Sequence, residues 1–111
     1  MPCPIPFDTD GTTVDPRYRN VLGGVAELLE ADGSVTATLQ GHTDNADPER
    51  AERVSRARAQ SVADYLVKEF GIDRSRLRVE GFGGTRRFSY DSSAEGRQQN
   101  RRVDVILSYP E

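Results

Sequence analysis

The sequence has only one cysteine, and this scarcity limits the chemistry open to the chain. Cys3 has no second cysteine to pair with, so no intrachain disulfide can form and no cluster of thiolates can hold a metal ion. The simplest interpretation of Cys3 is an incidental residue near the terminus. The alternative is an anchor or tether position in a longer precursor, which no lipidation signal in the sequence favours.

Long apolar runs are also missing. No stretch approaches the roughly 20 apolar residues of a membrane-spanning helix, and the start lacks the pattern of a signal peptide. Histidine occurs once, at His42, and Asp44 and Asp47 do not complete a convincing metal site with it. We therefore expect no metal and no cofactor, and membrane contact only through an anchor or barrel outside this sequence.

Size and charge narrow the class of protein. A length of 111 residues fits one domain, and we expect residues 1–111 to form it. A net charge of −3 argues against nucleic-acid binding. All basic residues except Lys68 are arginines, a composition that suits recognition of carboxylates or phosphates, or simply solubility. No feature predicts an oligomeric state.

Strand and helix patterns alternate along the first half of the chain. Ile5–Phe7 predicts an opening strand, and Asp15-Pro16 predicts the start of a helix that stops at Gly33. A half-buried strand should follow and deliver residues 41–44 at its end. The expected inward-facing residues are Tyr18, Leu22, Val25, Leu28 and Leu29 on the helix, and Val35, Ala37 and Leu39 on the strand.

The second half predicts a long helix and two more strands. Asp47-Pro48 predicts the helix start, and Gly71 follows its expected end at about Phe70. Strands are expected around residues 77–79 and 103–107, which gives an α/β two-layer sandwich, β-α-β-α-β-β, with helices on one face of a mixed four-stranded sheet. The expected buried face of the helix contains Ala51, Val54, Ser55, Arg58, Ala59, Val62, Ala63, Leu66 and Phe70.

An arginine on an apolar helix face is unusual and requires a partner. Arg58 should lie near Asp44, which comes at the end of the preceding strand. A carboxylate beside a guanidinium group can hold a zwitterion, because each half of an amino-acid head group finds its opposite charge there. The sequence therefore predicts a binding site for such a head group.

Four ordered motifs resemble one known family over roughly residues 5–107. They are Gly41-His-Thr-Asp-Asn45, Ser55-x-x-Arg58-Ala59, Gly81-Phe-Gly83, and Glu95-Gly-Arg-x-x-Asn-Arg-Arg-Val103. Together they resemble the OmpA C-terminal-like peptidoglycan-binding domain, which is shared by OmpA, Pal and MotB.

The resemblance implies a binding module without catalytic activity that grips the meso-diaminopimelate of the peptidoglycan stem peptide and so anchors a protein to the cell wall. It implies that Asp44 receives the ammonium group and Arg58 the carboxylate, with Thr43, Asn45 and Arg101 as further candidates. It also implies a location in the periplasm or elsewhere in the bacterial cell envelope.

The sequence departs from the family pattern in two loops. Residues 46–48 read Ala-Asp-Pro where the family usually has a glycine, one residue is missing before Arg58, and Ala51 replaces an expected asparagine. Arg87 replaces a proline, and Phe88 and Tyr90 make their loop more aromatic. Two outcomes stay open for the first loop: water or a neighbouring group replaces the missing amide, or the affinity is lower and the ligand preference changes. The second loop could contact glycan or a partner protein.

Other interpretations of the same residues remain open. Asp44 could only cap its loop, Arg58 could be a structural ion-pair partner of Glu80 or Glu95, and Arg101 could brace the last strand. An enzyme would need a nucleophile with an oriented base, or paired carboxylates, and no such pattern is present. The principal alternative function is a protein-interaction domain that has lost peptidoglycan binding.

Overall fold

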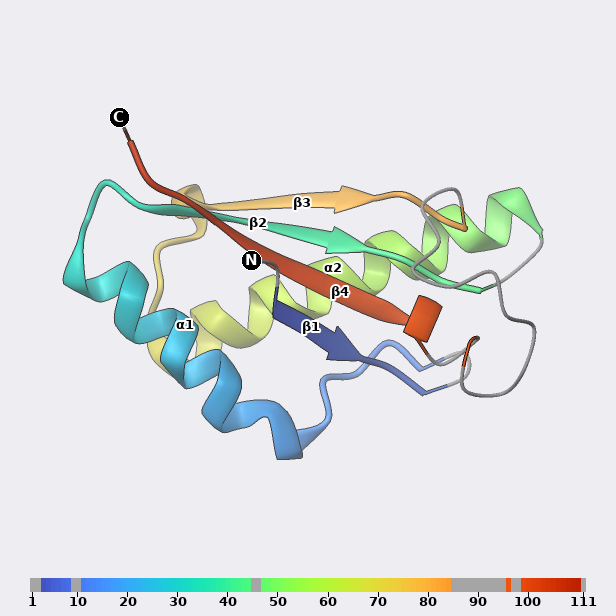
Figure 1. Cartoon of the computed structure of the whole chain (residues 1–111), viewed down its shortest axis with the longest axis horizontal. Coiled ribbons are helices and arrows are strands. Elements are labelled where there is room, and N and C mark those ends of the chain that lie inside the picture. The colour runs from blue at the N-terminus through green and yellow to red at the C-terminus, as the bar shows by residue number, and fades with distance from the viewer. Residues whose placement is uncertain (1–2, 9–10, 45–46, 85–95, 97–98, 111) are drawn as a thin grey trace.

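The computed structural model describes residues 3–8, 11–44, 47–84, 96 and 99–110. Four strands form one mixed sheet: β1 (Cys3–Pro6), β2 (Thr36–Gly41), β3 (Leu77–Gly81) and β4 (Arg102–Ser108), in the order β1-β4-β2-β3. Strands β2 and β3 are parallel, and β4 is antiparallel to both β2 and β1. The two helices, α1 (Arg19–Ala31) and α2 (Pro48–Phe70), cover one face (Figure 1). The predicted fold class and element order are confirmed.

Local sequence signals explain where the helices begin and end. The Asp47 carboxylate caps α2 by accepting a hydrogen bond from the Glu49 amide (3.2 Å), and Gly71 ends the helix in the left-handed region (φ 69°). Asp15 also acts as a cap, but of a short 3₁₀ turn, η1 (Pro16–Tyr18), so that α1 begins at Arg19 rather than directly after Asp15. A second 3₁₀ turn, η2 (Arg74–Arg76), leads into β3.

The core lies between the sheet and the helices, as the apolar pattern predicts. The buried apolar side chains include Leu22, Val25 and Leu29 of α1, Ala37 and Leu39 of β2, Ala59, Val62 and Leu66 of α2, and Val103 and Val105 of β4. One expected core residue is wrong: Leu28 is 49% exposed, because it lies just outside the arc of α1 that faces the sheet. Val54 and Phe70 are only half-buried.

Arg76 joins the end of α1 to the start of β2. Its guanidinium group donates hydrogen bonds to the carbonyl oxygens of Leu29 (2.6 Å), Asp32 (2.7 Å) and Val35 (2.8 Å). The last carbonyls of a helix have no partner within the helix, so this side chain satisfies groups that would otherwise face water. Among the helices described in the structure, none combines the length and apolar content needed to cross a membrane.

Candidate functional site

The candidate site forms where β2 and β3 end and β4 begins. The His42 amide donates to the Arg102 carbonyl (2.8 Å), and the Thr43 amide donates to the Gly83 carbonyl (3.0 Å). The Phe7 amide, just past β1, donates to the Arg101 carbonyl (2.9 Å). These bonds hold segments from four parts of the chain together at one end of the sheet.

Glycine at position 41 lets the end of β2 lie directly against α2. A Cβ atom there would be 1.8 Å from the Ser55 carbonyl oxygen, which is far inside van der Waals contact. The Ser55 hydroxyl also accepts a hydrogen bond from the Gly83 amide (2.9 Å). The close approach places Arg58, about one helical turn beyond Ser55, beside the segment that follows β2.

Arg58 is fully buried, as predicted, and contacts three backbone carbonyls. Its Nε donates to the Gly11 oxygen (2.8 Å), and its two terminal nitrogens donate to the oxygens of Asp8 (2.9 Å) and His42 (3.2 Å). The guanidinium carbon also lies 5.5 Å from the centre of the Phe7 ring. Arg58 therefore fastens the segment after β1 to the segment that carries Asp44.

The alternative role of Arg58 in an ion pair with Glu80 has no support in the described contacts. The Glu80 carboxylate accepts from the Gln40 amide (3.2 Å) and lies 3.8 Å from Arg78 Nε. Glu95, the other expected partner, lies outside the described residues.

Asp44 forms an ion pair with Arg101 at the partly exposed edge of the site. The distance between Arg101 Nη1 and Asp44 Oδ2 is 3.2 Å, and the side chains are 10% and 19% exposed, respectively. Arg101 Nε also donates to the Phe7 carbonyl (3.3 Å), so Arg101 braces the start of β4 as well. The described contacts thus pair the Asp44 carboxylate with the buried Arg101, whereas Arg58 contacts the same segment two residues earlier, at the His42 carbonyl.

Of the two remaining candidate residues, the structure describes Thr43 but not Asn45. Thr43 is buried, with 3% exposure, next to Asp44. Asn45 lies outside the described residues, as do Arg87, Phe88 and Tyr90 of the aromatic loop. Ala51, where the family usually has an asparagine, is buried within α2.

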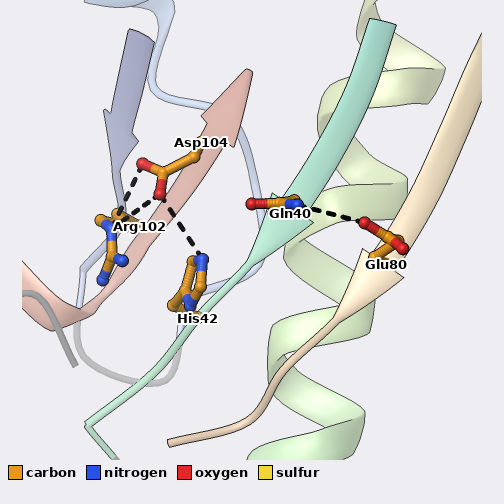
Figure 2. Close-up of polar contacts among 5 residues, drawn as sticks. All are labelled: Gln40, His42, Glu80, Arg102 and Asp104. Carbon is orange, nitrogen blue, oxygen red and sulfur yellow. Dashed lines mark hydrogen bonds and ion pairs between the residues drawn. The ribbon is translucent and has the colours of Figure 1, made fainter. Parts of the chain in front are cut away.

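On the sheet face away from α2, a polar network supports the segment that follows β2 and carries Asp44. Figure 2 shows Asp104 between Arg102, whose Nε is 3.2 Å from each carboxylate oxygen, and His42, whose Nε2 is 3.5 Å away. The His42 ring is 2% exposed and stacks on Phe82, with centroids 5.5 Å apart. His42 is therefore held in place by packing and by Asp104. Within the described part of the chain, no three His, Cys, Asp or Glu residues cluster as metal ligands would.

Sequence reasoning missed the part played by Phe7, Asp8 and Gly11. The Phe7 ring packs against Arg58, and the carbonyls of Asp8 and Gly11 accept two of its hydrogen bonds. Backbone carbonyls are common to all residues, so no sequence signal marks these two. A hollow of about 190 Å³ opens beside them, lined by Pro6, Phe7, Asp8, Thr13, Asp15, Arg17 and Tyr18.

Comparison with known proteins identifies relatives that match almost the whole of this chain. Outer membrane protein Omp38 of Acinetobacter baumannii is 41% identical over 92% of this chain, and peptidoglycan-binding protein ArfA of Mycobacterium bovis is 34% identical over 95%. The chain spans only 29% and 32% of the length of these two relatives.

The fold also matches a solved structure, the peptidoglycan-associated lipoprotein of Burkholderia pseudomallei. The TM-score is 0.89 at 22% identity, over 95% of this chain and 89% of that one. The sequence profile of the OmpA family matches residues 6–101. With this match over most of its length, the chain belongs to the OmpA family.

Proposed function

We propose that this domain binds bacterial peptidoglycan without catalysing a reaction, and so attaches a cell-envelope protein to the wall. Membership of the OmpA family supports the proposal, as does similarity to ArfA, whose name describes it as a peptidoglycan-binding protein. Peptidoglycan lies outside the cytoplasmic membrane, so the domain would work in the periplasm or elsewhere in the cell envelope. No nucleic-acid partner fits a net charge of −3.

The observation that carries the proposal is the ion pair of Asp44 with Arg101 close in sequence to a buried arginine contact. Asp44 pairs with Arg101 at 3.2 Å, and Arg58 donates to the carbonyl of His42, two residues before Asp44. The free end of meso-diaminopimelate carries an ammonium group and a carboxylate on one carbon. We assign the ammonium to Asp44 and the carboxylate to Arg58, with Thr43, Asn45 and Arg101 contributing further contacts.

The contacts that Asp44 and Arg58 already make limit how the ligand could bind to them. Its ammonium would share the Asp44 carboxylate with Arg101, because two oxygens can accept from both. Because Arg58 is fully buried, the ligand carboxylate would have to replace the Asp8 or Gly11 carbonyl as an acceptor of its hydrogen bonds. Arg101 lies close enough to Asp44 to share the carboxylate of the ligand.

Substitution of Asp44 tests the site. Asp44→Asn keeps the shape and removes the charge, and should weaken binding to purified sacculi by about 30-fold or more, since losing one partner of a desolvated pair costs about 2–5 kcal/mol. Asp64→Asn, an exposed position of α2, is the matched control and should bind like wild type. Unchanged binding by a folded Asp44→Asn variant would refute the site assignment.

A comparison of ligands tests the chemistry that the site recognises. Calorimetry should give clear binding of a stem peptide with free meso-diaminopimelate, and weak binding after the side-chain amine is acetylated, because the amide carries no charge to face Asp44. A lysine-containing peptide lacks the second carboxylate and should also bind weakly. Equal affinity for the free and acetylated peptides would show that Asp44 does not hold an ammonium.

The alternative, a protein-interaction domain that has lost the wall ligand, is favoured by Ala51 and by the shortened loop. Co-sedimentation with purified sacculi separates the two functions, because an interaction domain that has lost the wall ligand would stay in the supernatant when the sacculi are pelleted.

A further inference from the structure

We propose that Ser55 is a positioning residue for the candidate site: its hydroxyl group fixes the backbone that presents Asp44, without contacting the ligand itself. The inference rests on the proposed function, because it concerns the carboxylate that we assign to the ammonium group of the ligand. Ser55 is fully buried, on the face of α2 that packs against the sheet. A buried hydroxyl group needs hydrogen-bond partners, and those of Ser55 lead to the site.

Glycines at the ends of two strands allow Ser55 to reach the backbone that follows both of them. Gly41 ends β2 and Gly81 ends β3, and the two residues are partners in the parallel register. A Cβ atom at Gly81 would lie 3.0 Å from the Ser55 hydroxyl oxygen, and one at Gly41 would overlap the Ser55 carbonyl. A side chain at either position would push α2 away from the sheet. The two glycines therefore set the distance at which Ser55 acts.

The hydrogen bonds of Ser55 give its hydroxyl group a fixed direction. The hydroxyl donates to the Glu52 carbonyl oxygen (3.0 Å), in the preceding turn of the same helix. A hydroxyl group has a single proton, so its oxygen is left to accept, and it accepts from the Gly83 amide (2.9 Å). Gly83 has a positive φ of 58°, which residues other than glycine rarely adopt. Ser55 thus holds a turn whose backbone geometry depends on glycine.

Gly83 passes this constraint to the segment that carries Asp44. Its carbonyl oxygen accepts a hydrogen bond from the Thr43 amide (3.0 Å), and Thr43 directly precedes Asp44 in the chain. The Asp44 carboxylate in turn pairs with Arg101 at 3.2 Å. A chain of contacts therefore runs from the buried hydroxyl group, through the turn at Gly83, to the backbone from which the carboxylate of the site extends.

Arg58 holds the same segment independently, through its hydrogen bond to the His42 carbonyl (3.2 Å). Loss of the Ser55 hydroxyl should therefore loosen the segment without unfolding the domain. In Ser55→Ala, the Gly83 amide would lose its acceptor in a buried position, so the turn would leave this position for part of the time. We expect binding to sacculi to weaken by about tenfold, a smaller loss than that expected for Asp44→Asn.

Amide hydrogen exchange, measured by NMR without ligand, tests the contact. In Ser55→Ala, exchange at Thr43 should become about tenfold faster relative to exchange at Leu39, which lies within β2. A loss of overall stability alone would speed exchange at Leu39 at least as much as at Thr43. Ser61→Ala makes the same chemical change at a half-buried position of α2, and should leave the ratio of the two rates as in wild type.

Binding measurements on the same variants test the consequence for the site. Folding at 25 °C is first checked by circular dichroism. Ser55→Ala should then bind purified sacculi about tenfold more weakly than wild type, and Ser61→Ala should bind like wild type. Ser55→Ala should also lose part of the preference for the free stem peptide over the acetylated one, because that preference depends on where Asp44 lies. A role in stability alone would leave the preference unchanged.

Two results would overturn the proposal. One is an exchange ratio in Ser55→Ala equal to that of wild type. The other is unchanged sacculus binding and peptide preference in folded Ser55→Ala, in a series in which Asp44→Asn loses binding. Failure of the proposed function gives a different result, because wild-type protein would then stay in the supernatant; that outcome would overturn the role of Ser55 in binding as well.

Discussion

Removing the Arg58 guanidinium should loosen the segments that build the site. In Arg58→Ala, the His42 carbonyl would lose its donor in a buried position, which costs about 1–3 kcal/mol, and the Asp8 and Gly11 carbonyls would lose theirs where some water can reach. Loss of the contact with the Phe7 ring and the cavity left behind add to this. Relief from burying a charge offsets part of it, so we expect a net loss of about 3–5 kcal/mol.

Thermal unfolding followed by circular dichroism measures the effect. At roughly 4 °C per kcal/mol for a domain of this size, the midpoint should fall by about 12–20 °C. Small domains are stable by about 5–15 kcal/mol, so a protein in the upper part of that range would remain folded at 25 °C. Arg56→Ala is the matched control on α2: its side chain is 56% exposed and pairs with Glu52, so its midpoint should stay near that of wild type.

Arg58→Lys separates charge from geometry. Lysine keeps the positive charge, but a single ammonium cannot span the three carbonyls that the planar guanidinium group reaches. We expect a midpoint between those of wild type and Arg58→Ala, and no recovery of sacculus binding. If Arg58→Ala melts within a few degrees of wild type, the guanidinium does not hold the segments together, and the reasoning fails.

Two further predictions concern packing and pH. Gly41→Ala should lower the unfolding midpoint in urea and weaken ligand binding, because its methyl group would force β2 and α2 apart at Ser55; wild-type stability would mean that this contact is not close. Hydrogen bonds from Gln60 and then Arg74 lower the pKa of Asp64, and bonds from Ser75 lower the pKa of Asp73. A carboxyl group with a lowered pKa in the folded state stabilises the fold above its unfolded pKa, so the urea midpoint should fall as the pH drops below about 4. A midpoint that is constant down to pH 2 would contradict this.

The fold could be predicted because its signals are local. Asp47, Pro48 and Gly71 mark the ends of α2 through backbone geometry, and the alternation at residues 35–39 marks a strand with one buried side. The position of Leu28 was wrong because helical spacing gives the direction of a side chain but not the width of the face that the sheet covers.

The contacts of the candidate site residues were harder to predict than the elements that carry them. The burial of Arg58 follows from its neighbours on α2. Its partners are backbone carbonyls, which every residue has, so the sequence does not indicate which residues supply them. Asp44 and Arg101 are 57 residues apart in sequence, and only the pairing of β4 with β2 brings them together. The pairing of Asp44 with Arg101 could not be predicted without that register.

The strand order has a mechanical consequence for a domain held at its ligand loops. The first residue of β1 and the last residue of β4 lie at the end of the sheet away from these loops (Figure 1). A load applied through the chain before β1 or after β4 would therefore act along that strand and shear the hydrogen bonds to its neighbours. Strand β4 has seven residues and a neighbour on each side, whereas β1 has four, lies at the edge, and has two prolines that cannot donate hydrogen bonds. Pulling through the C-terminal end should therefore require more force than pulling through the N-terminal end, a difference that single-molecule extension would measure.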